Sequence, residues 1–393
     1  MSKEEFKRKA LSQIEDDEVI KLLQDAVRIP SHKDLPDQEK EMAEFFASWF
    51  DKRGIEVELQ RVEGPRQNVI ARVRGEGDGS TLMYNSHLDT KPPYNMTIEP
   101  YDPVIKDGNL YGRGSVDAKA QLAAFASALL AVKRAKIPLR GDLIFTGVVG
   151  EEWDSKGTLY IAKNGPKADM AVVGEPTKLE ICIAHKGIVR ATITTIGKAA
   201  HSSVPHLGIN AISKMGKVIR AIEEELPKKL EGKSHPLLGK STYSLGVING
   251  GVQPSIVPDK CSLTVDLRVL PGIWIEDVKE YFEEILENIK REDPEFKAEL
   301  SMSSRQPPLD TSESHPIVQA LKRSVNEIVG RMPKVTGAPF DTDASILANA
   351  GIPSVVCGAG DVRYAHAAVE LVPVGEVIAA AKIFTLTAVE ICC

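Results

Sequence analysis

The sequence is poor in cysteine and has no long apolar segment, and both absences narrow the class of protein. Five cysteines among 393 residues are too few for a disulfide scaffold, and none has the paired spacing of a zinc site. We therefore expect reduced thiols. No apolar run is long enough to cross a bilayer, and residues 1–5 are charged and lack the apolar segment typical of a signal peptide. These features predict a cytoplasmic chain that does not bind a membrane.

Neither sign of charge is in large excess. The 49 basic and 55 acidic residues give a formal charge of −6, which makes nucleic acids and anionic membranes unexpected partners. The chain is too long for one ordinary hydrophobic core, so its length predicts two domains. We find no internal repeat and no low-complexity segment.

The two outer parts of the chain have the pattern of a layered α/β domain. The apolar run 143–146 is typical of a strand buried in a parallel sheet, and residues 42–50 carry apolar side chains at helical spacing. Towards the C-terminus the pattern resumes with a helix near 315–330, an apolar strand at 353–357 and a final helix from about residue 372.

The middle of the chain has a different order of elements, β-α-β-β-α-β. This order is that of a ferredoxin-like domain, in which an antiparallel sheet has helices on one face. The fold class predicted is therefore α/β, with one domain formed by residues 1–180 and 307–393 and an α+β domain inserted at 181–306. Within the insertion we expect strands at 181–196, 242–249, 255–269 and 297–304, and helices at 209–226 and 275–291.

Polar side chains follow the apolar strands of the outer domain. Ligands of open α/β sheets bind outside the carboxyl ends of the strands, so these side chains lie where a site is expected. Nitrogen and oxygen ligands without sulfur suit zinc, cobalt or manganese, and such sites can hold two ions about 3.5–4 Å apart. A single ion held by three ligands is the simpler alternative. The residues are His87, Asp89, Asp117, Glu151, Glu152, Glu175 and His366.

Two less specific interpretations apply to the segments that carry these residues. Glu151 and Glu152 can be acids favoured by the dipole of a following helix. Gly112 and Gly114 can belong to a dinucleotide-binding turn, but the third glycine of that fingerprint is missing and Asp117 stands near its place.

Five motifs, in this order, resemble the co-catalytic zinc deacylases and exopeptidases. This family includes acetylornithine deacetylase, succinyl-diaminopimelate desuccinylase, aminoacylase and glutamate carboxypeptidase. The resemblance covers nearly the whole chain, including the inserted domain. The motifs stand here as Ser86-His87-Leu88-Asp89-Thr90, Gly112-Arg113-Gly114-Ser115-Val116-Asp117-Ala118-Lys119, Gly150-Glu151-Glu152, Gly174-Glu175-Pro176-Thr177 and His366-Ala367-Ala368-Val369-Glu370.

The resemblance implies an α/β metallohydrolase domain that binds two zinc ions, with cobalt as a substitute. Asp117 would bridge the ions, His87 and Glu175 would complete one site, and Glu152 and His366 the other. A zinc-bridging hydroxide would then attack the substrate.

Two further residues take roles beside the metals. The resemblance implies that Glu151 is the general base, because a carboxylate there can take the proton of the water and pass it to the leaving amine. The Asp89 carboxylate would accept the second imidazole N–H of His87 and fix its tautomer.

The inserted domain is expected to form a homodimer and, by moving, to close the site. The resemblance makes His201 a donor to the reaction's oxyanion, often across a dimer, although a loop histidine beside serines is also typical of a solvated cap. Arg268 would bind a substrate carboxylate, or form an ion pair with Asp266 on the same sheet face.

Two more residues are expected to contact the substrate. Asn249 would do so by analogy with the family, although an Asn-Gly pair between strands is also a hairpin-turn signal. Gly360 lies in a glycine-rich loop that suits a bound carboxylate, but small loops are also simply turns.

The resemblance leaves three functions open. The first is an amidohydrolase that removes the N-acyl group from an N-acyl amino acid, and the second is a dipeptidase or carboxypeptidase with the same metals. The third is a metal-free binding protein on the same scaffold. The sequence departs from the family at Ser86, where a glycine is usual, and in the loop 91–97, so the pocket walls are not predicted.

Overall fold

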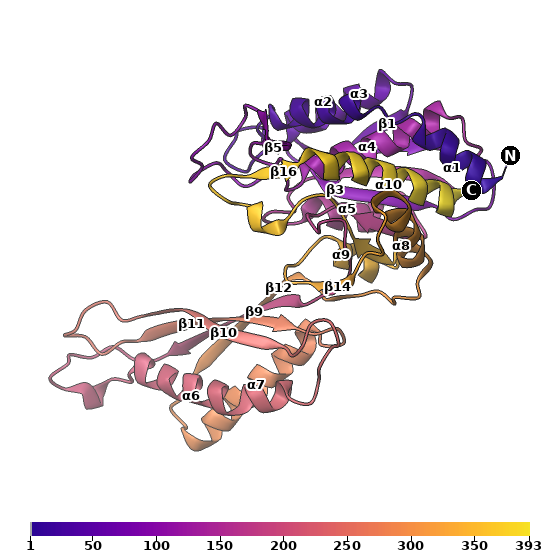
Figure 1. The fold of residues 1–393 in the computed structure, drawn as a ribbon. Helices are drawn as coiled ribbons and strands as arrows, with labels where there is room; N and C mark the ends of the chain where they lie inside the picture. The colour runs from indigo at the N-terminus through magenta and orange to yellow at the C-terminus, as the bar shows by residue number, and fades with distance from the viewer. Residues whose placement is uncertain (1) are drawn as a thin grey trace. The chain divides into compact units, whose positions relative to one another are not determined.

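The computed structural model describes residues 2–393, and the chain forms two compact units (Figure 1). The first unit runs to Ala184 and continues with Asp310–Gly337 and Thr342–Cys393. The second consists of His185–Leu309 and Ala338–Asp341 and is therefore inserted into the first.

The first unit is organised around a nine-stranded sheet of order β1-β2-β6-β3-β7-β15-β8-β13, with β14 paired to β8. Strand β3 runs parallel to β6 and β7, and β7 runs parallel to β15, which confirms the parallel arrangement predicted around residues 143–146. The strands are β1 (Glu56–Glu63), β2 (Arg66–Val73), β3 (Leu82–His87), β6 (Leu143–Val148), β7 (Met170–Val173), β8 (Ile181–His185), β13 (Leu309–Asp310), β14 (Val335–Ala338) and β15 (Ser354–Val356).

Helices α4 and α10 pack against each other beside this sheet (Figure 1). Aromatic rings join the layers: Tyr84 of β3 stacks on Phe125 of α4 at 4.6 Å, and Phe125 lies 4.5 Å from Phe384 of α10. The helices of this unit are α1 (Lys3–Leu11), α2 (Asp16–Val27), α3 (Lys40–Asp51), α4 (Lys119–Arg134), α5 (Lys156–Asn164), α8 (Pro316–Val329), α9 (Ala344–Asn349) and α10 (Val374–Cys392).

Two smaller features complete the unit. A three-stranded sheet of order β16-β5-β4 combines β16 (Leu371–Pro373), β5 (Asn109–Tyr111) and β4 (Ile105–Lys106). A 3-10 turn, η2 (Val362–Tyr364), precedes His366.

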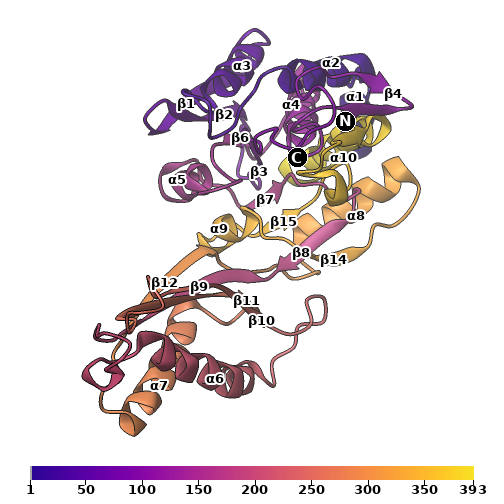
Figure 2. The same cartoon turned by 90° about the vertical axis from the view of Figure 1, so that its left-hand side faces the viewer.

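The second unit has the strand order β10-β11-β9-β12, with every pair antiparallel. Its chain order and pairing are those of the predicted ferredoxin-like fold, and helices α6 and α7 lie on one face of the sheet (Figure 2). The elements are β9 (Gly187–Ile196), η1 (Pro205–Leu207), α6 (Ala211–Leu230), β10 (Thr242–Gly250), β11 (Lys260–Val269), α7 (Ile275–Glu292) and β12 (Ala298–Gln306).

The single strand expected at 181–196 is wrong. The structure divides it at Lys186 into β8 and β9, which belong to different sheets. Residues of β8 are buried at every position, whereas β9 alternates from Val189 onward, but both segments are apolar and extended, so the sequence pattern does not place the break at Lys186.

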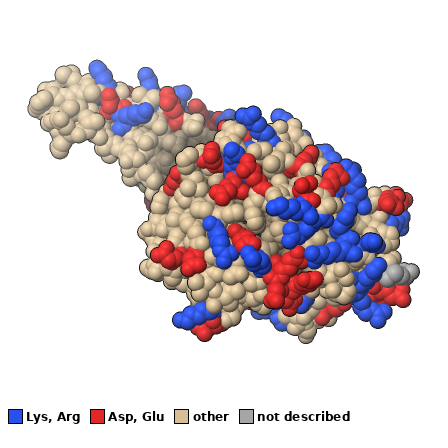
Figure 3. Space-filling view, turned by 90° about the horizontal axis from the view of Figure 1, so that it is seen from above, with Lys and Arg blue, Asp and Glu red and all other residues tan. Residues whose placement is uncertain are grey.

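The surface carries charges of both signs. Acidic and basic side chains are interspersed on the face seen in Figure 3. Many charged side chains of the protein are paired, as Arg74 is with Glu56 at 2.6 Å. Within residues 2–393, none of the helices combines the length and apolar character needed to cross a membrane.

Candidate metal centre

Three buried side chains meet at the carboxyl ends of the parallel strands. His87 is the last residue of β3, Glu175 lies two residues beyond β7, and Asp117 precedes α4. His87 Nε2 lies 3.0 Å from Asp117 Oδ1 and 3.7 Å from Glu175 Oε1, and one ligand atom from each residue lies within 4.8 Å of the others.

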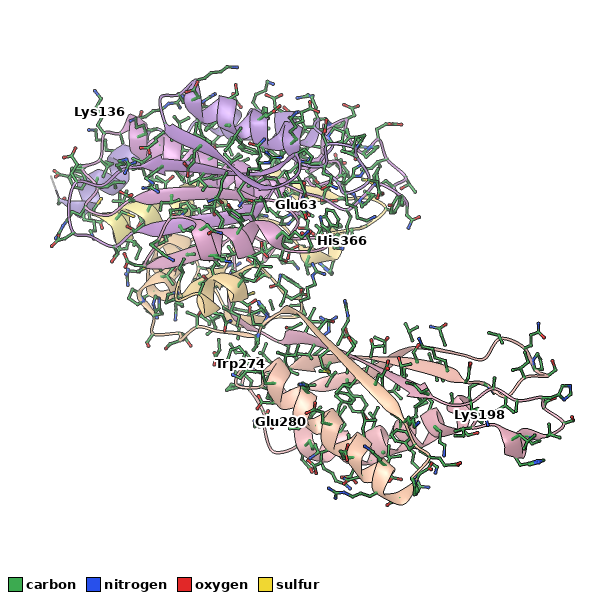
Figure 4. All side chains as sticks on the ribbon, turned by 180° about the vertical axis from the view of Figure 1, so that it is seen from behind. Glu63, Lys136, Lys198, Trp274, Glu280 and His366 are labelled. Atoms are coloured by element: carbon green, nitrogen blue, oxygen red, sulfur yellow. The ribbon has the colours of Figure 1, made fainter. Side chains whose placement is uncertain are left out.

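A second group shares Asp117 with the first. His366 Nε2 lies 3.1 Å from Asp117 Oδ2 and 2.9 Å from Glu152 Oε1. His366 lies on a loop (Figure 4). Its side chain is about half exposed, and its own φ is +60°. The two carboxylate oxygens of Asp117 therefore face two different histidines, as a residue shared between two cation sites requires.

The backbone fixes the tautomer of His87. Its Nδ1 lies 2.8 Å from the carbonyl oxygen of Asp89, and because a carbonyl only accepts, Nδ1 donates and carries the hydrogen. With Nδ1 engaged by the backbone, the ring turns Nε2 towards Asp117 and Glu175, where this nitrogen can bind a proton or a cation. The predicted acceptor was the Asp89 carboxylate, but its Oδ1 lies farther away, at 3.5 Å.

The Asp89 carboxylate instead holds the turn that carries the two glutamates. Its Oδ1 accepts from the backbone N–H groups of Gly150 and Glu151 at 3.0 and 3.1 Å, and its Oδ2 accepts from that of Glu152 at 3.0 Å. Three charge-assisted hydrogen bonds to one buried carboxylate fix the backbone of this turn. Asp89 thus orients Glu151 and Glu152 as well as His87.

The same turn is held from its other side by Arg66, which the sequence interpretation missed. The Arg66 guanidinium donates to both oxygens of Glu39 at 3.1 Å and to Asp154 at 2.9 and 3.3 Å, and it lies 4.6 Å from the centre of the Trp153 ring. A side chain on Gly150 would collide with Arg66 and Asp154, so only glycine admits this close approach.

Glu370 holds the loop that carries Asp117. Its Oε1 accepts from the backbone N–H groups of Val116 and Asp117 at 3.2 Å each, and its Oε2 accepts from Arg113 at 2.6 Å. The sequence interpretation gave Glu370 no role. Its position as the last residue of the fifth motif was the feature that could have identified it.

Burial shifts the protonation of the acidic groups in this cluster. Glu151 is buried, and desolvation followed by the nearby charge of Glu175 raises the pKa of its carboxyl well above the usual range. Desolvation also raises the pKa of Glu175. A carboxyl whose pKa is raised towards neutrality can exchange a proton near neutral pH.

The pKa values of the two histidines are also raised, because carboxylates surround them. Hydrogen bonds to Asp117 and then Glu152 raise the pKa of His366 to about 10. The pKa of His87 is also raised well above its usual value: burial opposes protonation, but hydrogen bonds to Asp117 and Asp89 outweigh it. Positive charge is therefore strongly favoured at both positions.

The cluster fits divalent cations. Its donors are imidazole nitrogens and carboxylate oxygens, which suit zinc and similar ions. Among residues 2–393, Glu175 Oε1 is buried and accepts no hydrogen bond, although its neighbours hold it beside His87. A buried carboxylate oxygen that accepts no hydrogen bond is typical of a metal ligand, since a bound cation would take the place of the hydrogen-bond donor.

Gly360 is held by neighbouring side chains and backbone. Its φ is +87°, and an added Cβ would lie 2.3 Å from Val116 Cγ2, so both the backbone and the packing require glycine. Its N–H donates to the Glu376 carboxylate at 2.8 Å, and its carbonyl accepts from the backbone N–H of Lys178 at 2.7 Å.

The remaining predicted residues lie in the second unit. Arg268 donates through Nε to Asp266 at 2.9 Å, which is the ion pair weighed as an alternative, and its Nη1 lies 3.8 Å from Asp341. Asn249 is paired with Ser262 inside β10, so the hairpin-turn interpretation of this residue is wrong. His201 is exposed, and its Nδ1 accepts from the Ser203 backbone N–H at 3.1 Å.

Comparison with known proteins decides the family. Residues 83–390 match the model of peptidase family M20/M25/M40. The chain belongs to this family. The M20 match spans every member of the cluster described above, from His87 to His366.

Individual relatives support the same placement. The M20 chain is 29% identical over 355 residues to acetylornithine deacetylase of Vibrio parahaemolyticus, covering 89% of this chain and 91% of that protein. It is 28% identical over 354 residues to a probable succinyl-diaminopimelate desuccinylase of Staphylococcus epidermidis, covering 83% and 85%. The crystal structure of aminopeptidase PepT from Bacillus cereus matches with a TM-score of 0.79 at 25% identity, covering 96% and 99%. The chain is a hydrolase that acts on amide bonds.

Proposed function

We propose that this M20 hydrolase is a dinuclear zinc amidohydrolase that removes the N-acyl group from an N-acyl amino acid. The observation that carries the proposal is Asp117, whose two oxygens face His87 in one group and His366 in the other. His87 and Glu175 would complete one cation site, and Glu152 and His366 the other. Cobalt is the expected substitute for zinc.

The chain's own residues would handle the proton. When bound, two divalent cations supply Lewis acidity that lowers the pKa of water and polarises the acyl carbonyl. Glu151 would take a proton from the attacking water and deliver it to the leaving amine nitrogen. Asp89 would keep Glu151 and Glu152 in place through the backbone of their turn.

His201 is proposed as a hydrogen-bond donor to the oxyanion. Because the Ser203 backbone N–H donates to Nδ1, the neutral imidazole carries its hydrogen on Nε2, and this nitrogen is then a donor. Arg268, Asn249 and Gly360 are proposed to contact the substrate, with Arg268 directed at a carboxylate.

The inserted unit is proposed as a dimerisation and lid domain at 181–306, within a catalytic domain formed by 1–180 and 307–393. Strand β10 is an edge strand that exposes Val247 and Ile248 by 55% and 52%, and the following loop exposes Val252 by 83%. Apolar side chains on an open edge favour pairing with a second copy. Light scattering that gave a monomer with full activity would contradict both the homodimer and a role for His201 across it. The cytoplasmic location stays a prediction from the sequence.

The exopeptidase alternative uses the same residues. It is favoured by the similarity to aminopeptidase PepT, whereas the named relatives at 28% and 29% identity favour deacylation. Zinc-loaded protein should be assayed with N-acetylornithine, N-succinyl-diaminopimelate and a dipeptide panel. Faster turnover of dipeptides would replace our proposal with the exopeptidase.

The role of Glu151 is tested by replacing it and its neighbour separately. We expect Glu151→Ala to bind two cations and to lose ~10²–10⁴ in rate, the usual contribution of a general base. Glu152→Ala is the matched control and should lose one cation. A rate for Glu151→Ala within about tenfold of the wild type would refute the general-base role. Absence of bound zinc or cobalt, with no hydrolysis after either is added, would favour the metal-free binding protein.

A further inference from the structure

Lys91 contacts the candidate metal centre, although neither the sequence interpretation nor the proposed function gives it a role. It opens the loop 91–97, where the sequence departs from the family pattern. Its ammonium nitrogen lies 2.8 Å from Glu152 Oε2 and also donates to the backbone carbonyl of Glu152. The side chain is about one-third exposed, whereas that of Glu152 is buried.

The two carboxylate oxygens of Glu152 contact different side chains. Oε1 faces His366 at 2.9 Å, and Oε2 is occupied by Lys91. Oε1 is therefore the oxygen of Glu152 that a cation would share with His366, and a positive charge already lies against Oε2.

The first group has no comparable partner. Among residues 2–393, no lysine or arginine forms an ion pair with Asp117 or Glu175, and both carboxylates are buried. The two groups thus offer a cation different electrostatic environments: the first has no lysine or arginine against its carboxylates, and the second has the charge of Glu152 partly neutralised by Lys91.

We propose that Lys91 is a positioning residue that holds Glu152 in one-oxygen geometry and weakens the second cation site. This inference rests on the proposed dinuclear function. Cations then bind in order, first at His87, Asp117 and Glu175, and then at the site that contains Glu152 and His366. The second cation exchanges more readily, because repulsion from the ammonium opposes its binding.

A merely structural role for Lys91 has the opposite consequence. If the lysine only fixed the loop 91–97 or the backbone of Glu152, its removal would loosen the site and weaken cation binding. Electrostatic repulsion predicts tighter binding when the charge is removed, so the direction of the change separates the two roles.

The test is a calorimetric titration of metal-stripped full-length protein with zinc, and separately with cobalt. We expect Lys91→Met to lower the second dissociation constant by about ten- to a hundredfold, as removing a charge a few ångströms away at intermediate dielectric implies, and to leave the first within about threefold. Lys91→Arg keeps the charge and should keep the wild-type second constant within the same range.

Lys382→Met is the matched control. Lys382 is exposed to a similar extent and pairs with Asp16 at 2.9 Å, outside the cluster. It should leave both constants unchanged. An unchanged or weaker second constant in Lys91→Met, with two cations bound, would overturn the role of Lys91 and leave the dinuclear function standing. Wild-type protein that bound fewer than two cations would overturn both.

Discussion

The two units of this chain treat charge in opposite ways. The first buries charged groups among its sheet and helices, including Arg66, Arg113 and Lys119, besides the acids of the candidate metal centre. The second has a core of apolar side chains from β9, β11, α6 and α7. In that unit the buried charges are few, and Asp293, at the end of α7, is paired with two lysines.

We interpret this difference as a division of roles: the buried charges of the first unit serve the chemistry of the site, and the apolar core of the second unit serves stability. Burying a charge costs free energy that its ion pairs only partly offset, so a folded chain retains such groups mainly where their positions matter. An apolar core has no such requirement and contributes through burial and packing alone. Removing a buried charge from the first unit should therefore disturb both stability and the site, whereas a cavity in the second should affect stability only.

The largest effect is expected from Arg66→Met. This change leaves Glu39 buried without its partner, which should lower the free energy of unfolding by about 3–5 kcal/mol. It should also loosen the turn of Glu151 and Glu152 and so weaken the second cation site. Denaturant unfolding and zinc calorimetry measure the two effects.

Arg53→Met is the control for this prediction. Arg53 also lies over a tryptophan, 4.0 Å from the ring of Trp49, and also pairs with a glutamate, Glu18, but it is partly exposed. Its removal should cost about 1 kcal/mol or less. Equal losses in the two variants would contradict a special role for Arg66.

A smaller effect is expected from Leu226→Ala in the second unit. The side chain is fully buried on α6, and truncation should lower the free energy of unfolding by about 2–4 kcal/mol. Zinc stoichiometry and both dissociation constants should stay at wild-type values well below the melting temperature. A lost cation in this variant would show that the two units are not independent in this respect.

The smallest effect is expected from Asp293→Asn. Hydrogen bonds from Lys214 and then Lys217 lower the pKa of Asp293 to about 2. Because the folded-state pKa is below the unfolded one, the carboxylate stabilises the fold at neutral pH, and this contribution is lost as the pH falls from about 4 to 2. The variant should be about 1–2 kcal/mol less stable at pH 7, and the difference should vanish below about pH 2. A difference independent of pH would contradict the ion-pair explanation.

Strand ends were the most informative feature of the sequence. An apolar run followed at once by His87, or by Glu151 and Glu152, places these side chains at one edge of a parallel sheet, and the structure brings them there. The alternation in β11 likewise places Leu263 and Val265 on the buried face, as expected.

Other features escaped because their partners are distant in sequence. Arg66 meets Glu39 and Asp154, which lie 27 and 88 positions away, and no local pattern links them. Helix α1, in contrast, could have been predicted from a local pattern. Ser2 and Glu5 form a capping box at its start, and this spacing is visible in the sequence.

By itself, the sequence determined the order of elements, the inserted domain and the set of side chains that end the strands. Periodicity and residue type encode these directly, since each depends on neighbours along the chain. Only the tertiary structure decided that Asp117 faces two histidines, that Asp89 holds a turn through its carboxylate, and that Lys91 occupies one oxygen of Glu152. Such contacts depend on the directions of side chains brought together from separate segments. Small shifts in these directions decide which carboxylate oxygen accepts from which group, and no local pattern in the sequence encodes them.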